Sequence, residues 1–455
     1  MRLAFLDGLA VPPGALLEWA VSAEPVPDPT PPTANQVLHL TADGPTTWLA
    51  AVFDVPGPID EAALEAAFAA WLPRHDGLHC CFTPPAGADG PGLRLVSDND
   101  IRLIARPPAS ATSAGEMRNL LGARLDAACA PFTFPPYFLG AITRPDVSTV
   151  VCGFDHAVCD AWSTTVAVTE LDALYRAACE DGPAAVDAAA ESLPEPGSFL
   201  CYCTREAAAP TTETGTLLRG WQEFLRAAGD DLPHFPLDLG VPAGARAAAD
   251  SDVRTMLTPA DIAGLDRRSR AGGHSVFAVL LAAIAHSVAK LGGGAHTDLV
   301  FPVHTRREPR NHHTFGWLVA NAPARIRAED DLAAAIPGAA AAVRDGQRLA
   351  RIPATTVFAA DGTVLRRARH GLFSVSYTDY RHLPGGSRGE SGHALPRGAT
   401  QISRSAPVDD VQLWFARTDE GLTLRTRFPG TATARGVVSE FLCVLTDLVR
   451  TAARD

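Results

Sequence analysis

The spacing of apolar residues in this chain predicts helices and strands in alternation. In residues 59–74, Leu64, Phe68 and Leu72 recur every four positions, which places them on one face of a helix. Asp60 stands near the start of this stretch, where the helix dipole favours an acidic side chain. The pattern therefore predicts an amphipathic helix over 59–74.

The same reasoning extends to the rest of the chain. Helices are expected at 117–129, 164–179, 220–228, 276–291 and 437–452. A further helix is expected to begin at Pro259, after the capping residue Thr258. Strands are expected at 35–40, 47–55, 79–82, 137–142, 149–154, 299–303, 317–320, 373–377, 411–416 and 422–427, the last two as a hairpin. The Ala/Glu/Pro-rich stretch 182–196 is expected to be a surface connection. This succession indicates the α+β class.

Length and composition limit the possible functions. A chain of 455 residues with 47% hydrophobic residues is too long for one ordinary core, so two lobes are expected. The net charge of −12 and the lack of a basic run argue against nucleic acid as a partner. Nine scattered cysteines favour a reducing, cytoplasmic location. The opening residues are not expected to be a signal peptide, because Asp7 and two prolines interrupt their apolar stretch, and no uninterrupted apolar run reaches the length of a membrane span.

The stretch with the clearest chemical content is 148–163, where a β-branched run ends at Asp155, His156 and Asp160 and a helical pattern follows. This order predicts a strand, a turn and a helix. Histidine is well suited to take and return a proton near neutral pH, and a carboxylate four residues on can fix the geometry around it. His156 and Asp160 are therefore the candidate catalytic pair.

Other histidines and cysteines have structural interpretations. The spacing His-x-x-x-Asp also occurs at His39 and His234, but without the strand-to-helix context, so His39 is interpreted as a strand residue and His234 as a loop residue. His312 and its neighbour precede Phe315 without a second ligand cluster, and no metal site is expected. Cys159 is interpreted as a packing residue.

Several motifs, in order, resemble the condensation-domain superfamily of acyltransferases. They cover nearly the whole chain: Arg74-His-Asp-Gly-Leu-His-Cys-Cys-Phe82, the stretch 131–142, Asp155-His-Ala-Val-Cys-Asp-Ala161, Pro302-Val-His-Thr-Arg306, Phe315-Gly-Trp-Leu-Val-Ala-Asn-Ala-Pro-Ala-Arg325 and Phe373-Ser-Val-Ser-Tyr377. The third occupies the place of the family's His-His-x-x-x-Asp-Gly motif.

The resemblance implies a fold and an activity. It implies two chloramphenicol-acetyltransferase-like lobes, 1–200 and 201–455, arranged as a V with a tunnel between them. The implied enzyme is a free-standing acyltransferase of secondary metabolism, expected to be monomeric and to bind no cofactor tightly. Its donor would be an acyl or aminoacyl thioester of phosphopantetheine, on a carrier protein or on coenzyme A. The acceptor would be an amine or an alcohol, and the bond an amide or an ester.

By motif position, the resemblance also assigns roles to single residues. His156 becomes the catalytic histidine, as general base or orienting residue, and Asp160 a structural carboxylate paired with Arg306 across the lobe junction. Asp155 is a supporting residue. The remaining candidates are oxyanion donors or residues of the tunnel wall: Ala161, Trp162, Trp317 and Ser376.

Two positions depart from the family motif, and they keep other functions open. Asp155 stands in place of the first histidine, and Ala161 in place of a glycine, which would be unfavourable if that position required a positive φ. Altered motifs are typical of non-catalytic condensation-like platforms that recruit a partner enzyme, so such a platform is the alternative. The dipeptide Gly316-Trp317 also resembles the epimerisation branch of the superfamily, so an epimerase is a second and weaker alternative.

Overall fold

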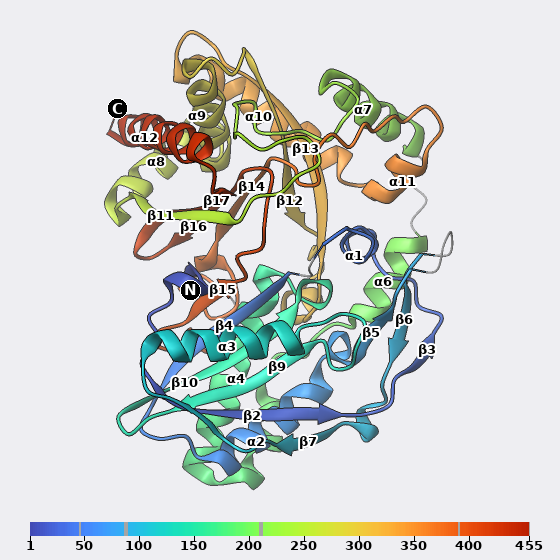
Figure 1. The fold of residues 1–455 in the computed structure, drawn as a ribbon, viewed down its shortest axis with the longest axis vertical. Coiled ribbons are helices and arrows are strands. Elements are labelled where there is room, and N and C mark those ends of the chain that lie inside the picture. Colours follow the sequence, from blue (N-terminus) through green and yellow to red (C-terminus); the bar gives the residue numbers. More distant parts are fainter. Residues whose placement is uncertain (45–46, 86–89, 209–212, 390–391, 455) are drawn as a thin grey trace. The chain divides into compact units, whose positions relative to one another are not determined.

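The computed structural model describes residues 1–44, 47–85, 90–208, 213–389 and 392–454 (Figure 1). Its contacts divide the chain into two compact units. The first unit comprises Met1–Ala209, Thr305–Leu318 and Tyr380–Arg404, and the second comprises Pro210–His304, Val319–Asp379 and Ser405–Asp455. The first unit thus includes two segments from beyond residue 300. The division of the chain into lobes 1–200 and 201–455, expected from the sequence, stays a prediction.

The first unit is built on a mixed sheet with helices on both faces. Its strand order is β1 (Arg2–Phe5), β15 (Thr400–Ser403), β4 (Trp48–Pro56), β10 (Val147–Asp155), β9 (Tyr137–Thr143), β2 (Gly14–Ser22) and β7 (Arg102–Ala105), with β8 (Ala109–Ala111) also paired to β2. A smaller sheet joins β3 (Val26–Asp28), β6 (Gly92–Leu95) and β5 (Cys80–Thr83).

Strand β10 is central in this sheet and is buried on both faces. Helices α2 (Glu61–Trp71) and α4 (Ala161–Asp181) pack together, and their apolar side chains share one core with those of β4 and β10. Helix α3 (Ala114–Ala128) contributes Met117, Leu121 and Leu125 to a separate core with Val151 of β10. A β-branched run without polar alternation is the pattern expected of a strand enclosed in this way.

The second unit contains a six-stranded sheet in the order β11 (Ala249–Leu257), β17 (Gly421–Pro429), β16 (Gln412–Thr418), β14 (Ser374–Asp379), β12 (His296–His304) and β13 (Val319–Arg327). Its main core also contains side chains of α8 (Pro259–Ala271), α9 (Val276–Lys290), α10 (Leu332–Leu349) and α12 (Ala432–Arg454). Helices α7 (Thr214–Ala227) and α11 (Ala354–Ala359) form a smaller cluster beside it. The expected hairpin is confirmed, because Thr418 pairs with Gly421 between β16 and β17.

The α+β class is confirmed, but the prediction of a strand at 35–40 is wrong. This segment is helix α1 (Ala34–Leu40). Thr33 caps it by accepting from the Gln36 N–H, and the Gln36 side chain accepts from the Thr33 N–H in return. This capping box begins a helix in a segment whose apolar residues, Val37, Leu38 and Leu40, are too few to show a helical spacing.

Three other predictions need smaller corrections. The stretch 182–196 contains helix α5 (Val186–Ser192), and the side chains of Val186 and Leu193 are buried rather than exposed on a surface connection. The strand expected at 317–320 begins at Val319 as β13. Helices α6 (Phe199–Ala208) and α10 were not predicted, and α10 is rich in alanine and contains Pro337, so it lacks a clear apolar spacing.

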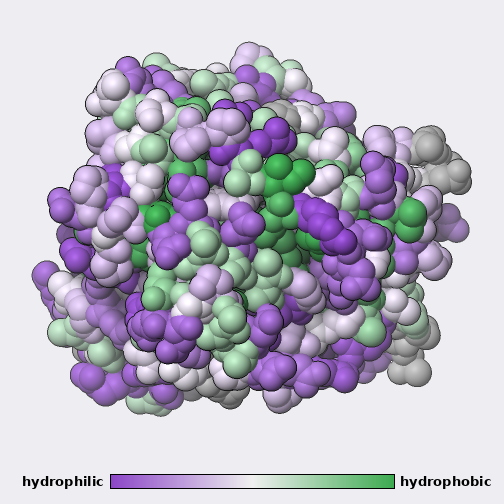
Figure 2. Space-filling model, turned by 90° about the horizontal axis from the view of Figure 1, so that it is seen from below, coloured by the Kyte–Doolittle hydropathy of each residue, from purple (hydrophilic) through white to green (hydrophobic). Residues whose placement is uncertain are grey.

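Hydrophobic side chains are largely enclosed. Figure 2 shows a face covered mostly by hydrophilic residues, with hydrophobic ones in small groups. The large hydrophobic residues that the described part of the chain exposes are Val26, Ile104, Val253 and Val364.

No single helix in the described ranges is both long and apolar enough to cross a membrane. The bent pair formed by α8 and α9 meets those two criteria jointly, by length and composition only.

Candidate active site

The candidate motif lies where β10 passes into α4. The strand ends at Asp155, a short 3-10 turn covers His156–Val158, and α4 begins at Ala161. Asp160 is the N-cap of α4, and its Oδ1 accepts from the Ser163 N–H at 2.8 Å. The predicted strand, turn and helix are therefore confirmed, and the N-cap explains why an aspartate suits this position.

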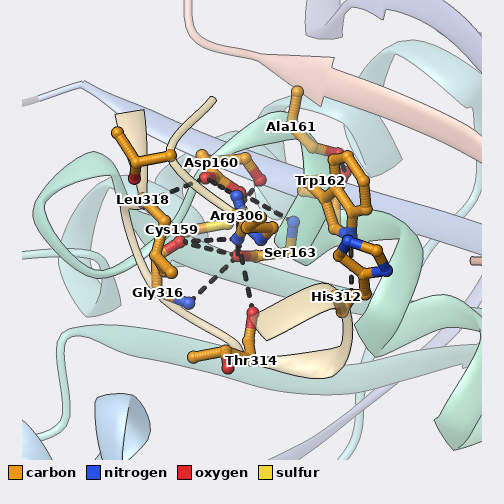
Figure 3. A network of polar contacts seen from close by, with 12 residues as sticks. Cys159, Asp160, Ala161, Trp162, Ser163, Arg306, His312, Thr314, Gly316 and Leu318 are labelled. Atoms are coloured by element: carbon orange, nitrogen blue, oxygen red, sulfur yellow. Dashed lines mark hydrogen bonds and ion pairs between the residues drawn. The ribbon is translucent and has the colours of Figure 1, made fainter. Parts of the chain in front are cut away.

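Asp160 forms a buried ion pair with Arg306 (Figure 3). Arg306 Nη1 lies 2.5 Å from Asp160 Oδ2, and Nη2 lies 3.0 Å from Oδ1, so the guanidinium binds both carboxylate oxygens. Both residues belong to the first unit, because Thr305–Leu318 is part of it. The predicted pair of Asp160 and Arg306 is therefore present, within a single contact unit.

The same ion pair holds the segment that follows Arg306. Arg306 Nη2 also donates to the carbonyl groups of Thr314 and Gly316, at 3.3 and 3.2 Å. Asp160 Oδ2 accepts from the Leu318 N–H at 3.1 Å. These bonds fix the backbone on both sides of Trp317.

Ser163 completes this network (Figure 3). Its hydroxyl lies 2.8 Å from Asp160 Oδ1 and 2.8 Å from the Gly316 carbonyl, and it accepts from Gly316 N–H and Arg306 Nη2, both at 3.0 Å. The side chain is fully buried. Ser163 is therefore a structural link in the network.

The electrostatics of Asp160 follow from these contacts. Burial alone would raise the pKa of the carboxyl group, but the charge and hydrogen bonds of Arg306 outweigh it and hold this pKa below its usual value. Burial raises the pKa of the adjacent Cys159 thiol well above its usual value. Asp160 is therefore ionised and Cys159 protonated at neutral pH.

His156 has a different environment. Its ring lies 4.2 Å from the Trp317 ring, measured between centroids, and its backbone N–H donates to the Thr47 carbonyl at 2.9 Å. Nδ1 is enclosed without a hydrogen-bond partner among the described residues, whereas Nε2 is not enclosed in this way. Burial and, to a smaller extent, the nearby His39 together lower the pKa of His156 to about 4. The imidazole is therefore neutral at pH 7, as a proton acceptor must be.

His39 was not predicted as a site residue. It lies on α1, and its Nε2 is 3.1 Å from Oδ1 of the fully buried Asp155. The His39 ring is 6.1 Å from the His156 ring and 5.7 Å from the Trp317 ring. The capping box at Thr33 was a usable signal for the helix, but nothing in the sequence showed that α1 packs beside the motif.

The other predicted site residues are Ala161 and Trp162 in the first unit and Ser376 in the second. Ala161 does not adopt a positive φ, so the concern raised by the missing glycine does not apply. Trp162 donates from Nε1 to the His312 carbonyl at 2.7 Å and lies 5.3 Å from the Arg306 guanidinium, beside the network. Ser376 lies on β14 of the second unit, and its place on a tunnel wall stays a prediction.

Within the described ranges, no three His, Cys, Asp or Glu side chains are grouped closely enough to hold a metal ion.

Comparisons with known proteins agree with this geometry. Residues 33–379 match the condensation domain family. The trehalose-2-sulfate acyltransferase PapA2 of Mycobacterium tuberculosis is 25% identical over 465 residues, covering 97% of this chain and 95% of the relative. A solved structure of a PapA2 acyl transferase covers both chains fully, with 22% identity and a TM-score of 0.86. The first condensation domain of the CDA synthetase has 16% identity and a TM-score of 0.63, covering 91% of this chain and 92% of that one.

The match over most of the chain defines the class of protein. The chain belongs to the condensation domain family. It is a condensation-type acyltransferase, similar over its whole length to PapA2.

Proposed function

We propose that this enzyme transfers an acyl group from a phosphopantetheine thioester to a hydroxyl or amine acceptor, with His156 as the general base. One observation carries the proposal: His156 has one ring nitrogen, Nε2, that is not enclosed, and it stays neutral at pH 7, four residues before a buried ion pair in which Arg306 binds both oxygens of Asp160. The neutral form is the one that can accept a proton from the acceptor.

The chemistry follows from this arrangement. His156 Nε2 takes the proton of the acceptor O–H or N–H while a lone pair of that acceptor oxygen or nitrogen attacks the thioester carbonyl. The C–S bond then breaks, and the proton passes to the leaving thiolate, so that thiol and acylated acceptor are the products. The oxyanion formed in between needs hydrogen-bond donors. The Ala161 N–H, in the first turn of α4, remains a candidate because helix starts leave such donors unused inside the helix.

The donor and acceptor are proposed by chemical class. Thioester donors are typical of condensation-family acyltransferases, so coenzyme A and an acyl carrier protein are both candidate carriers of the donor. Because the relative PapA2 is named a trehalose-2-sulfate acyltransferase, we place ester formation on a sugar hydroxyl ahead of amide formation.

Mass spectrometry tests this proposal. Purified wild-type protein would be incubated with medium- and long-chain acyl-coenzyme A and acyl carrier proteins, each with trehalose, trehalose 2-sulfate or a pooled set of amines. We expect acceptor-dependent loss of acyl thioester and a product whose mass is the acceptor plus the acyl group. His156→Ala should give none, and the control His296→Ala, which changes an exposed histidine, should match wild type.

The alternative of a recruitment platform has a different outcome. Tight binding of an acyl carrier protein without loss of its acyl group, equal in wild type and His156→Ala, would contradict acyl transfer. Turnover that persists in His156→Ala would contradict the role of the histidine.

A further inference from the structure

Helix α1 is attached to the turn that carries His156 by two side chains on one of its faces. Gln36 Nε2 donates to the Ala157 carbonyl at 2.7 Å, and His39 Nε2 lies 3.1 Å from Asp155 Oδ1. The same Asp155 oxygen accepts from the Ala157 N–H at 2.8 Å. Residues three apart on a helix share a face, so one helix holds both sides of the turn.

We propose that His39 and Asp155 form a positioning pair for His156: His39 donates to Asp155, and Asp155 holds the turn that orients the catalytic ring. This inference rests on the proposed function. The inference deepens that function by assigning a role to Asp155, the acidic residue at the motif's first position, and to His39, which is 116 residues away in the sequence.

The burial of Asp155 is the first argument. Its side chain is fully buried, and its Oδ2 has no hydrogen-bond partner among the described residues. A buried carboxylate is costly unless hydrogen bonds and a charge partner compensate it. His39 Nε2 and the Ala157 N–H both serve Oδ1, so removing His39 leaves the carboxylate with a single bond.

The charges around His156 are the second argument. The titratable groups that face it are His39 on α1, Asp155 at the end of β10 and Asp160 at the start of α4. Arg306 already pairs with Asp160. Asp155 is therefore the carboxylate left to balance the positive charge that forms when His156 takes a proton, while His39 fixes where that carboxylate lies.

The Trp317 ring contacts the imidazole rings of both His156 and His39. Its ring lies 4.2 Å from the His156 ring and 5.7 Å from the His39 ring, in the latter case edge to face. The bonds from Arg306 and Asp160 hold the backbone on both sides of Trp317. The His156 ring thus has a fixed aromatic neighbour, and the positioning pair sets the turn against it.

Steady-state kinetics with the substrates found as above test the pair. His39→Ala should lower kcat about 10- to 100-fold with little change in KM, because orientation of the base is lost and substrate binding is not. His39→Gln should restore most of kcat, since its amide N–H can replace the Nε2–H donor. A kcat for His39→Gln as low as for His39→Ala would overturn positioning through this hydrogen bond.

The pH dependence of kcat/KM distinguishes a positioning pair from residues that only stabilise the fold, because loss of stability alone would not shift its acidic limb. His39 lowers the pKa of His156 and Asp155 raises it, so their removal should shift the acidic limb of kcat/KM in opposite directions. We expect the limb to move to higher pH in His39→Ala and to lower pH in Asp155→Asn. His296→Ala is the control: it removes an exposed histidine of β12, outside this group of residues, so its limb should not move.

The possible failures are distinguishable. If His156→Ala is inactive but both His39→Ala and Asp155→Asn keep the wild-type kcat and acidic limb, the positioning pair is wrong and the proposed function stands. If His156→Ala is active, the proposed function itself is wrong. Should His39→Ala not fold, NMR titration of the 13C-labelled His156 ring in His39→Gln and Asp155→Asn decides the matter, because unchanged ring titration in both variants would overturn the inference.

Discussion

Asp160 and His156 lie four residues apart in one motif, yet their surroundings are opposite. Both Asp160 oxygens are taken up by Arg306, Ser163 and the Leu318 N–H. His156 makes ring contact with Trp317, and its Nδ1 is enclosed without a hydrogen-bond partner among the described residues, whereas its Nε2 is not enclosed in this way. The oxygens of Asp160 are therefore committed to the structure, whereas Nε2 of His156 is left to accept a proton.

This comparison assigns the two residues separate roles. The Asp160 network should determine stability, since an unpaired buried charge is expensive. The His156 ring should determine turnover, since it is neutral and its loss leaves no charge behind. If substitutions of Asp160 and of His156 changed stability and turnover equally, the two residues would not have separate roles.

The largest expected effect is on turnover. His156→Ala should lower kcat/KM by at least about 100-fold, the usual contribution of a general base, with an unchanged free energy of unfolding. Acyl-transfer assays and urea unfolding measure the two quantities on the same preparation. A variant that keeps more than about a tenth of the activity would remove His156 from the mechanism.

The Asp160 network should give the largest effect on stability. Asp160→Ala leaves Arg306 buried without its partner and is expected to cost about 3–5 kcal/mol of unfolding free energy, measured in urea. Arg205→Ala is the control, because its pair with Glu308 is exposed and worth less than about 1 kcal/mol. Equal losses in the two variants would show that burial does not make the Asp160 pair special.

Ser163→Ala should have an intermediate effect. It removes a buried hydroxyl that bonds the Gly316 N–H and Arg306, and an unsatisfied buried donor costs about 1–3 kcal/mol. Calorimetric and urea unfolding would report the loss. An unchanged stability would mean that Asp160 and Arg306 hold this segment without Ser163.

The smallest effect is expected at Ala161. Because it has a negative φ at the first position of α4, Ala161→Gly should cost less than about 1 kcal/mol and leave kcat/KM unchanged. A large gain in kcat/KM would instead show that the alanine methyl group obstructs a substrate at the motif's last position.

The sequence predicted the local elements of this site but not the way they meet. The strand at β10, the helix α4 and the hairpin of β16 and β17 follow from apolar spacing and turn residues, which are local properties. The approach of Arg306 to Asp160 was predictable only through the resemblance to a family. His39 was missed because the short segment around it was interpreted as a strand, and because its contact with Asp155 joins segments 116 residues apart.

The measurement that tests the account most directly is the pH dependence of kcat/KM of the wild-type enzyme from about pH 3.5 to 9, with short exposure to acid. Folding lowers the pKa of His156 from its usual value of about 6.5 to about 4, so protonation weakens the folded state as pH falls between these values. The base form should persist above pH 4, and we predict an acidic limb near pH 4 that is reversible on return to neutral pH. A limb near about pH 6.5 would contradict a desolvated, neutral His156 as the catalytic base.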